Sequence, residues 1–221
     1  FVFCKDVFER AAGRRLTSLE CHDIMCKIGE VVVVGGVRRS AMISLGDLHD
    51  DRHRNAKVGN WWEQNVQRAL SNNSAVYEER PSPGVFISEW KSLYDSHSGE
   101  RGIFNRAASR DQAEKSGRRD VGYEFGTNPC SEIILRPYQF CNLSEVVVRA
   151  DDDLDSLKRK VRLATILGTV QSTLTDFKYL RKIWKTNTEE ERLLGVSLTG
   201  ILDQPTLSFD RELLSSLREL S

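Results

Sequence analysis

The residues with the clearest capacity for chemistry lie in the run Asn128-Pro129-Cys130-Ser131-Glu132. A carboxamide stands two residues before the thiol, and a carboxylate stands two residues after it. In an extended or loop backbone, positions two apart point to the same side, so Asn128, Cys130 and Glu132 can face one substrate. They would offer a sulfur for radical or nucleophilic work, an acid or base, and a hydrogen-bond donor. The alternative is a buried thiol beside a solvated Glu132, because cysteine often serves as a small apolar residue.

A second thiol, Cys141, follows eleven residues later in Phe140-Cys141-Asn142-Leu143-Ser144-Glu145. Two cysteines that flank a short strand–turn–strand can meet in a redox site, and a buried thiol is again the alternative. The chain has five cysteines in 221 residues. This odd and small number favours free thiols in a reducing cytosol over a secreted disulfide scaffold.

A third candidate is the run Gly35-Gly36-Val37-Arg38-Arg39-Ser40, which follows a valine-rich stretch. Glycines after a strand let backbone amides approach a ligand, and two arginines can grip a phosphate or stack on a base. The run is neither a P-loop nor a Gly-x-Gly-x-x-Gly motif. A tight surface turn is the alternative.

Other chemistry-bearing residues give weaker signals. Cys21-His22-x3-Cys26 lacks a second ligand pair at zinc spacing, so we expect no metal there. His49, His53 and His97 stand in polar stretches and are expected to be solvated. The local signatures of cysteine peptidases are missing from the sequence.

The elements that must position these residues can be read from the hydrophobic pattern. Helices are expected over 5–30, 61–70, 86–94 and 151–184. Strands are expected over 31–34, 41–45, 75–77, 133–135, 146–148 and 195–198. Loops are expected over 37–40, 71–74 and 95–122. The run at 31–34 is typical of a strand buried on both faces, and Thr17 to Glu20 of a capping box. Strands separated by helices indicate an α/β fold with parallel strands.

Composition narrows the classes of function. Lys plus Arg and Asp plus Glu both number 32, so the formal net charge is zero. That balance argues against a general nucleic-acid binder and a polybasic membrane-surface protein. The sequence has neither an apolar run of about 18 residues nor a signal-peptide pattern. Because it starts at Phe1 and stops inside an amphipathic run, we expect an internal piece of a longer protein.

Five segments, in this order, resemble the large catalytic chain of ribonucleotide reductases: 32–41 (VVVGGVRRSA), 70–75 (LSNNSA), 99–106 (GERGIFNR), 128–133 (NPCSEI) and 140–146 (FCNLSEV). Leu194–Gly200 also resembles a segment of that family. The resemblance covers most of residues 12–203. The adenosylcobalamin-dependent branch of the family is resembled in two features, the spacing of Cys130 and Cys141 and the Asn-Pro-Cys sequence. The valine-rich stretch resembles the monomeric triphosphate reductases. An iron- or manganese-loaded partner chain is the alternative radical source.

The resemblance implies a ten-stranded α/β barrel with a central finger loop, of which residues 1–221 would form part as a partial catalytic domain. It implies that Cys130 is the radical cysteine and removes the 3′ hydrogen of a ribonucleotide, which makes deoxyribonucleotides for DNA synthesis. Glu132 would act as general base, and Asn128 would bind the substrate hydroxyls. Cys141 would supply reducing equivalents with a partner thiol expected upstream of residue 1, so Cys4, Cys21 and Cys26 would be structural thiols.

The resemblance also implies that Gly35 to Ser40 link an allosteric nucleotide site to the substrate base, with Arg38 sensing the base. Expected partners are a deoxynucleotide or ATP effector and a thioredoxin-like dithiol reductant, without nucleic acid or membrane, in the cytoplasm of a bacterium or a phage-infected host. Ser131 stands where the family often has glycine, and Arg101 where it often has proline. The rival functions are a nucleotide-binding regulatory module without catalysis and a structural thiol protein.

Overall fold

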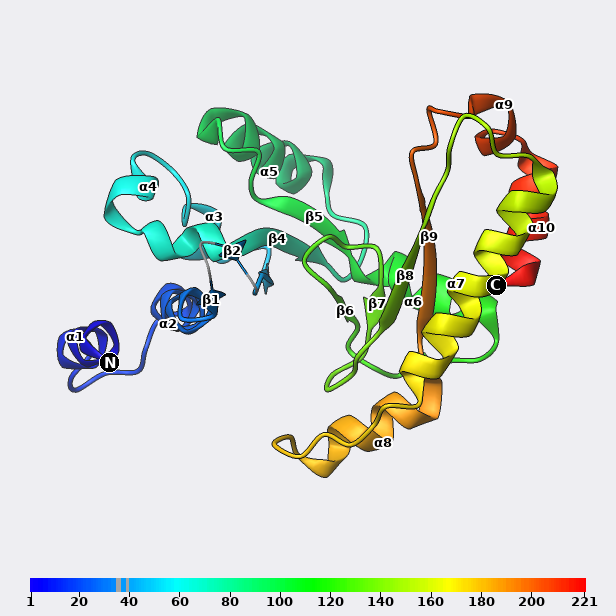
Figure 1. Ribbon diagram of the computed structural model, residues 1–221. Helices are drawn as coiled ribbons and strands as arrows, with labels where there is room; N and C mark the ends of the chain where they lie inside the picture. Colours follow the sequence, from blue (N-terminus) through cyan, green and yellow to red (C-terminus); the bar gives the residue numbers. More distant parts are fainter. Residues whose placement is uncertain (35–36, 39) are drawn as a thin grey trace. The chain divides into compact units, whose positions relative to one another are not determined.

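The longer strands of this chain pair in parallel, and a helix lies in each crossover between them (Figure 1). The computed structural model describes residues 1–34, 37–38 and 40–221, and 33, 34, 37 and 38 only by their backbone. The chain divides into two compact units, Phe1–Ile134 and Leu135–Ser221. The predicted α/β class with parallel strands is confirmed. The barrel, its finger loop and a partial barrel domain over 1–221 stay predictions.

The first unit carries the elements from α1 to β6. Its helices are α1 Val2–Arg10, α2 Ser18–Glu30, α3 Asp51–Arg54, α4 Trp61–Gln64, the 3₁₀ helix η1 Val66–Leu70, α5 Pro83–Ser96 and α6 Arg106–Ser116. Its strands are β1 Val33–Val34, β2 Val37–Arg38, β3 Met42–Gly46, β4 Ser71–Tyr77, β5 Gly102–Asn105 and β6 Gly126–Thr127. The short β7, Ile134–Leu135, lies where the two units meet in sequence.

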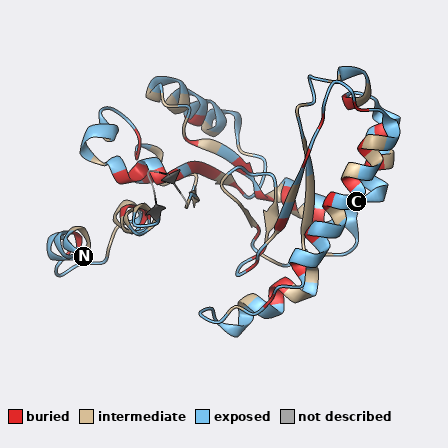
Figure 2. Cartoon of the chain, viewed as in Figure 1, coloured by how far each residue is buried: buried red, intermediate tan, exposed pale blue. Residues whose placement is uncertain are grey.

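Strand β4 is the centre of the three-stranded sheet β3-β4-β5. Met42 stands opposite Ser71 and Ser74 opposite Gly102 in the two parallel ladders. Figure 2 shows buried residues along most of β4. The prediction of a loop over 71–74 is therefore wrong. Asn is depleted in strands, but here the buried Asn73 accepts a hydrogen bond from the buried Ser71, which offsets this propensity.

Two helix predictions in the first unit need correction. The helix expected over 5–30 is two helices, α1 and α2. The helical backbone is interrupted at Gly13, which has φ of 82°, and a new helix begins after Thr17. The predicted capping box is confirmed: Thr17 Oγ1 accepts the Glu20 amide, and Glu20 accepts the Thr17 amide. The helix expected over 61–70 is α4 followed by η1. The predicted helix over 86–94 is confirmed within α5.

The loop predicted over 95–122 is also wrong, since β5 and α6 occupy its middle. Helix α6 starts after Asn105, whose side chain accepts the Ala108 amide, and ends at Gly117 with φ of 65°. An asparagine N-cap and a C-terminal glycine are both helix signals in sequence. The many Ser, Gly and Arg residues around them are more typical of a loop, so the local pattern points in two directions.

The valine run was predicted as one strand buried on both faces, and this is wrong. Val31 and Val32 continue the last turn of α2, with amides donating to Ile28 and Gly29, and their side chains are 81% and 47% exposed. Only Val33–Val34 forms a strand, β1, which pairs antiparallel with β2. Val37–Arg38 is therefore strand and not the loop predicted there.

The second unit is a β–α–β crossover followed by two C-terminal helices. Its elements are β8 Asn142–Val147, α7 Leu154–Ser172, α8 Lys182–Glu191, β9 Leu194–Thr199, α9 Pro205–Ser208 and α10 Arg211–Leu220. Strands β8 and β9 pair in parallel along their whole length. The core lies between this sheet, α7 and α10, and its buried residues are Val146, Val148, Leu157, Val161, Ala164, Leu213 and Leu217. The strands predicted over 41–45, 133–135, 146–148 and 195–198 correspond to β3, β7, β8 and β9, with ends shifted by a few residues.

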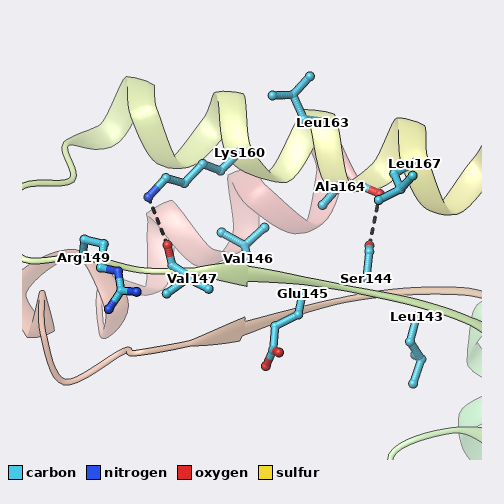
Figure 3. A pocket seen from close by; sticks show the side chains of 10 residues that line it. All are labelled: Leu143, Ser144, Glu145, Val146, Val147, Arg149, Lys160, Leu163, Ala164 and Leu167. Atoms are coloured by element: carbon cyan, nitrogen blue, oxygen red, sulfur yellow. Dashed lines mark hydrogen bonds between the residues drawn. The ribbon is translucent and has the colours of Figure 1, made fainter.

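A shallow groove runs between β8 and α7 (Figure 3). Ser144 and Val146 point from the strand toward the helix, while Glu145 points to the opposite side. Two hydrogen bonds join the walls of the groove: Ser144 Oγ donates to the Ala164 carbonyl and Lys160 Nζ to the Val147 carbonyl, both at 3.0 Å. These bonds bridge the helix and the strand at two points along the groove.

The long helix predicted over 151–184 ends early, at Ser172, and α8 begins at Lys182. Asp153 caps α7 by accepting the Ser156 amide. The apolar face was predicted to reach Phe177, yet Leu167 and Val170 lie exposed. Among the residues described, no helix is both long and apolar enough to cross a membrane.

Candidate active site

Residues 128–133 form a closed turn, which we call the Cys130 turn. The Ser131 amide donates to the Asn128 carbonyl at 3.0 Å, and the Ile133 amide donates to Asn128 Oδ1 at 3.2 Å. Ser131 has φ of 66°, in the left-handed region that favours glycine. Pro129 and Cys130 are thus the central residues of the turn, and Asn128 closes it with both its backbone and its side chain.

Two hydrogen bonds tie the turn and the chain that leads into it to other elements of the first unit. Arg106 Nε donates to the Phe125 carbonyl at 2.7 Å, and Asn72 Nδ2 donates to the Pro129 carbonyl at 2.7 Å. Phe125 is fully buried, and the Arg119 guanidinium lies 5.0 Å from its ring centroid. The chain that leads into Cys130 is therefore fixed on the unit at a buried aromatic residue and again next to the thiol.

The Cys130 thiol and the Glu132 side chain are exposed, whereas Asn128 is half-buried. An extended backbone would place Asn128, Cys130 and Glu132 on one side. The backbone here is not extended, because a turn with a left-handed residue interrupts the alternation of side chains. The three stay within five residues of each other, and their common approach to a substrate stays a prediction.

Cys141 belongs to the second unit, where it is half-buried directly before β8. Its neighbour Asn142 is held by both its amide and its side chain, which donate to the Leu193 carbonyl at 2.9 and 3.1 Å. The backbone next to Cys141 is thus held in place at the start of β8. A shared redox site of Cys130 and Cys141 stays a prediction, since the two thiols lie in different units.

The predicted nucleotide loop is described only in part. Gly35, Gly36 and Arg39 lie outside the described residues, and Val37 and Arg38 are seen as the backbone of β2. Ser40 Oγ donates to the Gly29 carbonyl at 2.7 Å and so ties the end of the run to α2. The roles of Gly35 to Ser40 and of the base-sensing Arg38 stay predictions.

Sequence reasoning missed a buried polar cluster next to β4. His53, expected to be solvated, is 4% exposed, with Nε2 at 3.0 Å from Ser44 Oγ and Nδ1 at 3.2 Å from Arg101. Burial and the charge of Arg101 lower the pKa of His53 to about 4. His49 and His97 are exposed, as predicted. A helical spacing could not reveal this cluster, because its members come from separate elements.

His22 occupies the other side of this cluster, where Nε2 lies 3.0 Å from Asn73 Oδ1 and Nδ1 lies 3.6 Å from Asp23. Burial lowers the pKa of His22, but contacts with Asp23, Cys26 and Asn73 outweigh it and raise the value to about 9. Arg68 grips Asp23 through two bonds of 2.6 and 2.7 Å. Burial opposes the charge of Asp23, yet Arg68 and His22 lower its pKa to about 2.

The cysteines near this cluster differ in exposure. Cys26 is fully buried with its sulfur 3.7 Å from His22 Nδ1, Cys21 is exposed and Cys4 is half-buried. The buried position of Cys26 suits a structural thiol, and the exposed Cys21 does not pack in a core. Among the residues that the structure describes, no group of three or more His, Cys, Asp or Glu side chains gathers to hold a metal ion.

The chain matches curated proteins over most of its length, although no protein-family model matches it. It is 33% identical over 204 residues to a protein of Levilactobacillus brevis, covering 89% of this chain and 26% of the relative. It is 33% identical over 214 residues to a protein of Lactobacillus acidophilus, covering 92% and 27%. A third match, from Lactobacillus gasseri, is 30% identical over 223 residues and covers 96% and 28%.

All three relatives bear the name adenosylcobalamin-dependent ribonucleoside-triphosphate reductase. The chain spans about a quarter of their length. The matched stretch takes in nearly all of this chain and therefore both cysteine motifs. By this relation the chain belongs to the ribonucleotide reductase family, and its relatives named here are of the adenosylcobalamin-dependent branch.

Proposed function

We propose that this chain forms part of the catalytic barrel of a ribonucleotide reductase that reduces ribonucleoside triphosphates to 2′-deoxyribonucleotides through a thiyl radical. The observation that carries the proposal is the Cys130 turn, which presents an exposed thiol on an anchored loop. Radical chemistry needs a thiol that a hydrogen acceptor can reach and a backbone that holds its position. The names of the relatives support the same reaction and substrate class.

In the proposed reaction the Cys130 thiyl takes the hydrogen atom from C3′ of the ribose. Glu132 takes the proton of the 3′-hydroxyl as general base, and Asn128 donates a hydrogen bond to a substrate hydroxyl. The 2′-hydroxyl then leaves as water with a proton from one thiol of the pair formed by Cys141 and a second cysteine, and C2′ receives a hydrogen atom from the other thiol. The pair thereby gives two electrons and two protons and becomes a disulfide. Glu132 returns its proton to the 3′-oxygen, and Cys130 returns its hydrogen atom to C3′. An external dithiol, such as a thioredoxin-like protein, reduces the disulfide again.

The cofactor proposed for this site is adenosylcobalamin, which when bound would supply the radical that takes the hydrogen atom of the Cys130 thiol. The residues fit such a source, because the thiol is exposed at the apex of its turn and open to a reactant from outside the chain. The closed turn keeps the sulfur in place while the hydrogen atom leaves and returns. We further propose a deoxynucleotide or ATP as effector at Gly35 to Ser40, and a cytoplasmic location.

The test uses the intact protein that carries this segment. Deoxynucleotide formation from ribonucleoside triphosphates is measured with a dithiol reductant, with and without adenosylcobalamin. Cys130→Ala and Glu132→Gln are compared with Cys21→Ala, which removes another exposed thiol of the same unit. We expect cobalamin-dependent product that disappears in Cys130→Ala, falls at least 100-fold in Glu132→Gln, and persists in Cys21→Ala.

Two outcomes separate the rivals. Product that forms only after a metal-loaded partner chain is added keeps the reductase and overturns the cofactor. No product under either condition, with nucleotide still bound equally by wild type and Cys130→Ala, overturns catalysis and favours a regulatory nucleotide-binding module. A protein that binds no nucleotide at all would be a structural thiol protein.

A further inference from the structure

Asn72 is the residue of the central sheet that reaches the Cys130 turn. Its Nδ2 donates to the Pro129 carbonyl at 2.7 Å. That carbonyl belongs to the peptide bond that joins Pro129 to Cys130. The hydrogen bond therefore fixes the orientation of the peptide plane next to the thiol-bearing residue. Asn72 and the turn both lie in the first unit.

The strand that carries Asn72 is held firmly on its other face. Ser71 and Asn73, its neighbours in β4, are 1% and 3% exposed. Ser71 Oγ donates to Asn73 Oδ1 at 3.0 Å, and the Asn73 amide donates to Glu100 at 3.2 Å. Because alternate residues of a strand point to opposite faces, this buried side of β4 leaves the Asn72 side chain on the face that meets the turn.

Bonds inside the turn set its shape: Asn128 closes it through bonds to Ser131 and Ile133. Arg106 and Arg119 hold the chain on either side of the turn, at the Phe125 and Ile134 carbonyls. The Asn72 bond adds a contact within the turn, at the peptide next to the thiol. Asn72 is exposed, and an exposed hydrogen bond contributes little to the global free energy of unfolding because water replaces the partner. The effect of this hydrogen bond is instead local, because it fixes the position of the Cys130 backbone.

We propose that Asn72 is a positioning residue for Cys130, acting through the Pro129 carbonyl and not by touching substrate. This inference rests on the proposed reductase function. Without the amide donor, the Pro129–Cys130 peptide can rotate and the thiol samples positions away from the reacting atom. Misplacement by about 1 Å can cost up to about 100-fold in rate, so a partial loss of order predicts a fall of about tenfold.

The test compares three variants of the intact protein. Asn72→Leu keeps the size but removes the donor, and Asn72→Gln keeps a donor on a longer side chain. Asn55→Leu is the matched control, because Asn55 is also exposed and its Nδ2 also donates to a backbone carbonyl, that of Asp51 at 2.9 Å, far from the turn in sequence. Each is assayed for kcat, KM and amide hydrogen exchange in peptides that cover 126–134 and 42–46.

For Asn72→Leu we expect kcat to fall about tenfold with KM within about twofold, and amide exchange over 126–134 to rise at least about threefold while β3 keeps its protection. Asn72→Gln should recover part of both, and Asn55→Leu should match wild type. Wild-type kcat and exchange in Asn72→Leu would overturn the proposal. Faster exchange in β3 and over 126–134 alike would overturn it too, because it would show a general loss of stability.

The two proposals can fail separately. If the wild-type protein forms no deoxynucleotide, the reductase function fails, and the exchange comparison alone then decides whether Asn72 holds the turn. If wild type is active and Asn72→Leu is equally active with an unaltered turn, the positioning role fails and the reductase function stands.

Discussion

Arg101 and Glu89 form a buried two-bond ion pair, with Nε to Oε2 at 3.0 Å and Nη2 to Oε1 at 2.9 Å. The two side chains are 2% and 7% exposed. Arg101 also donates to the carbonyls of Asp47 and Leu48. This pair therefore links α5, the start of β5 and the loop after β3.

Removal of the Glu89 carboxylate should strongly destabilise the first unit, because it leaves the Arg101 charge buried without its counterion. Glu89→Ala is expected to lower the free energy of unfolding of the first unit by about 3–5 kcal/mol. Asp95→Ala, on the same helix, breaks the exposed pair with Lys91 and should change it by less than about 1 kcal/mol. Urea unfolding measures both. Equal effects of the two substitutions would contradict the importance of burial.

The two buried histidines predict a stability maximum near pH 6.5. The pKa of His22 is raised to about 9, so its contribution is complete below 6.5, the ordinary value, and is lost as pH rises through 9. The pKa of His53 is lowered to about 4. Its neutral form therefore favours folding above pH 6.5, and that contribution is lost as pH falls through 4.

The measurement is urea unfolding from pH 4 to 10, with Trp184→Phe so that the tryptophans of the first unit report on it. His22→Gln should flatten the alkaline limb, and His53→Gln the acid limb. His97→Gln replaces an exposed histidine and should leave both limbs in place. A profile that keeps its alkaline limb in His22→Gln would refute the assignment of that limb to His22.

How much of this was predictable depends on whether the signal is local. The capping box at Thr17 and the parallel β8–α7–β9 crossover follow from local spacing, and both are confirmed. The buried strand Ser71–Ser74 could not be predicted in this way. His22 contacts the Asn73 side chain, while Lys57 and Glu100 bond to the Ser71 carbonyl and the Asn73 amide, and all three residues lie outside the strand.

The candidate site shows the same division. The motif around Cys130 indicates the chemistry, because the residue types themselves carry it. The turn geometry does not follow from the alternation rule, since one left-handed residue, Ser131, is enough to break it. The anchor from Asn72 depends on a contact over 57 positions, and no spacing within the motif reports it.

Ser131→Gly should be tolerated and should stabilise the Cys130 turn. Ser131 has φ of 66°, a conformation that costs most residues about 1 kcal/mol and glycine almost nothing. The larger entropy of glycine in the unfolded chain offsets part of this gain, so we expect a net increase of about 0.5 kcal/mol. Ser88→Gly, in the middle of α5, is the control with the opposite sign and should cost about 0.5–1 kcal/mol. A clear destabilisation by Ser131→Gly, measured by urea unfolding, would mean that the serine hydroxyl has a role of its own.

Gly200→Ala should damage the second unit far more than its backbone angle alone explains. Gly200 follows β9 with φ of 70°, and a Cβ there would lie 2.5 Å from the Val148 carbonyl oxygen. That carbonyl is backbone of the residue whose amide donates to Thr199 at 2.8 Å, so it cannot move without opening the end of the β8–β9 ladder. We expect a loss of about 3 kcal/mol, combining about 1 kcal/mol for the left-handed angle with the strain of a close contact in a packed region. Gly117→Ala provides the matched control, because its φ is 65° and nothing lies within 4 Å of its Cβ position. Gly117→Ala should lose only the part of the unfolding free energy that is due to the left-handed backbone angle. Unfolding of the second unit is followed through Trp184 for Gly200→Ala, and unfolding of the first unit through its own tryptophans for Gly117→Ala. A Gly200→Ala loss no greater than that of Gly117→Ala would show that the two strand ends can separate at little cost.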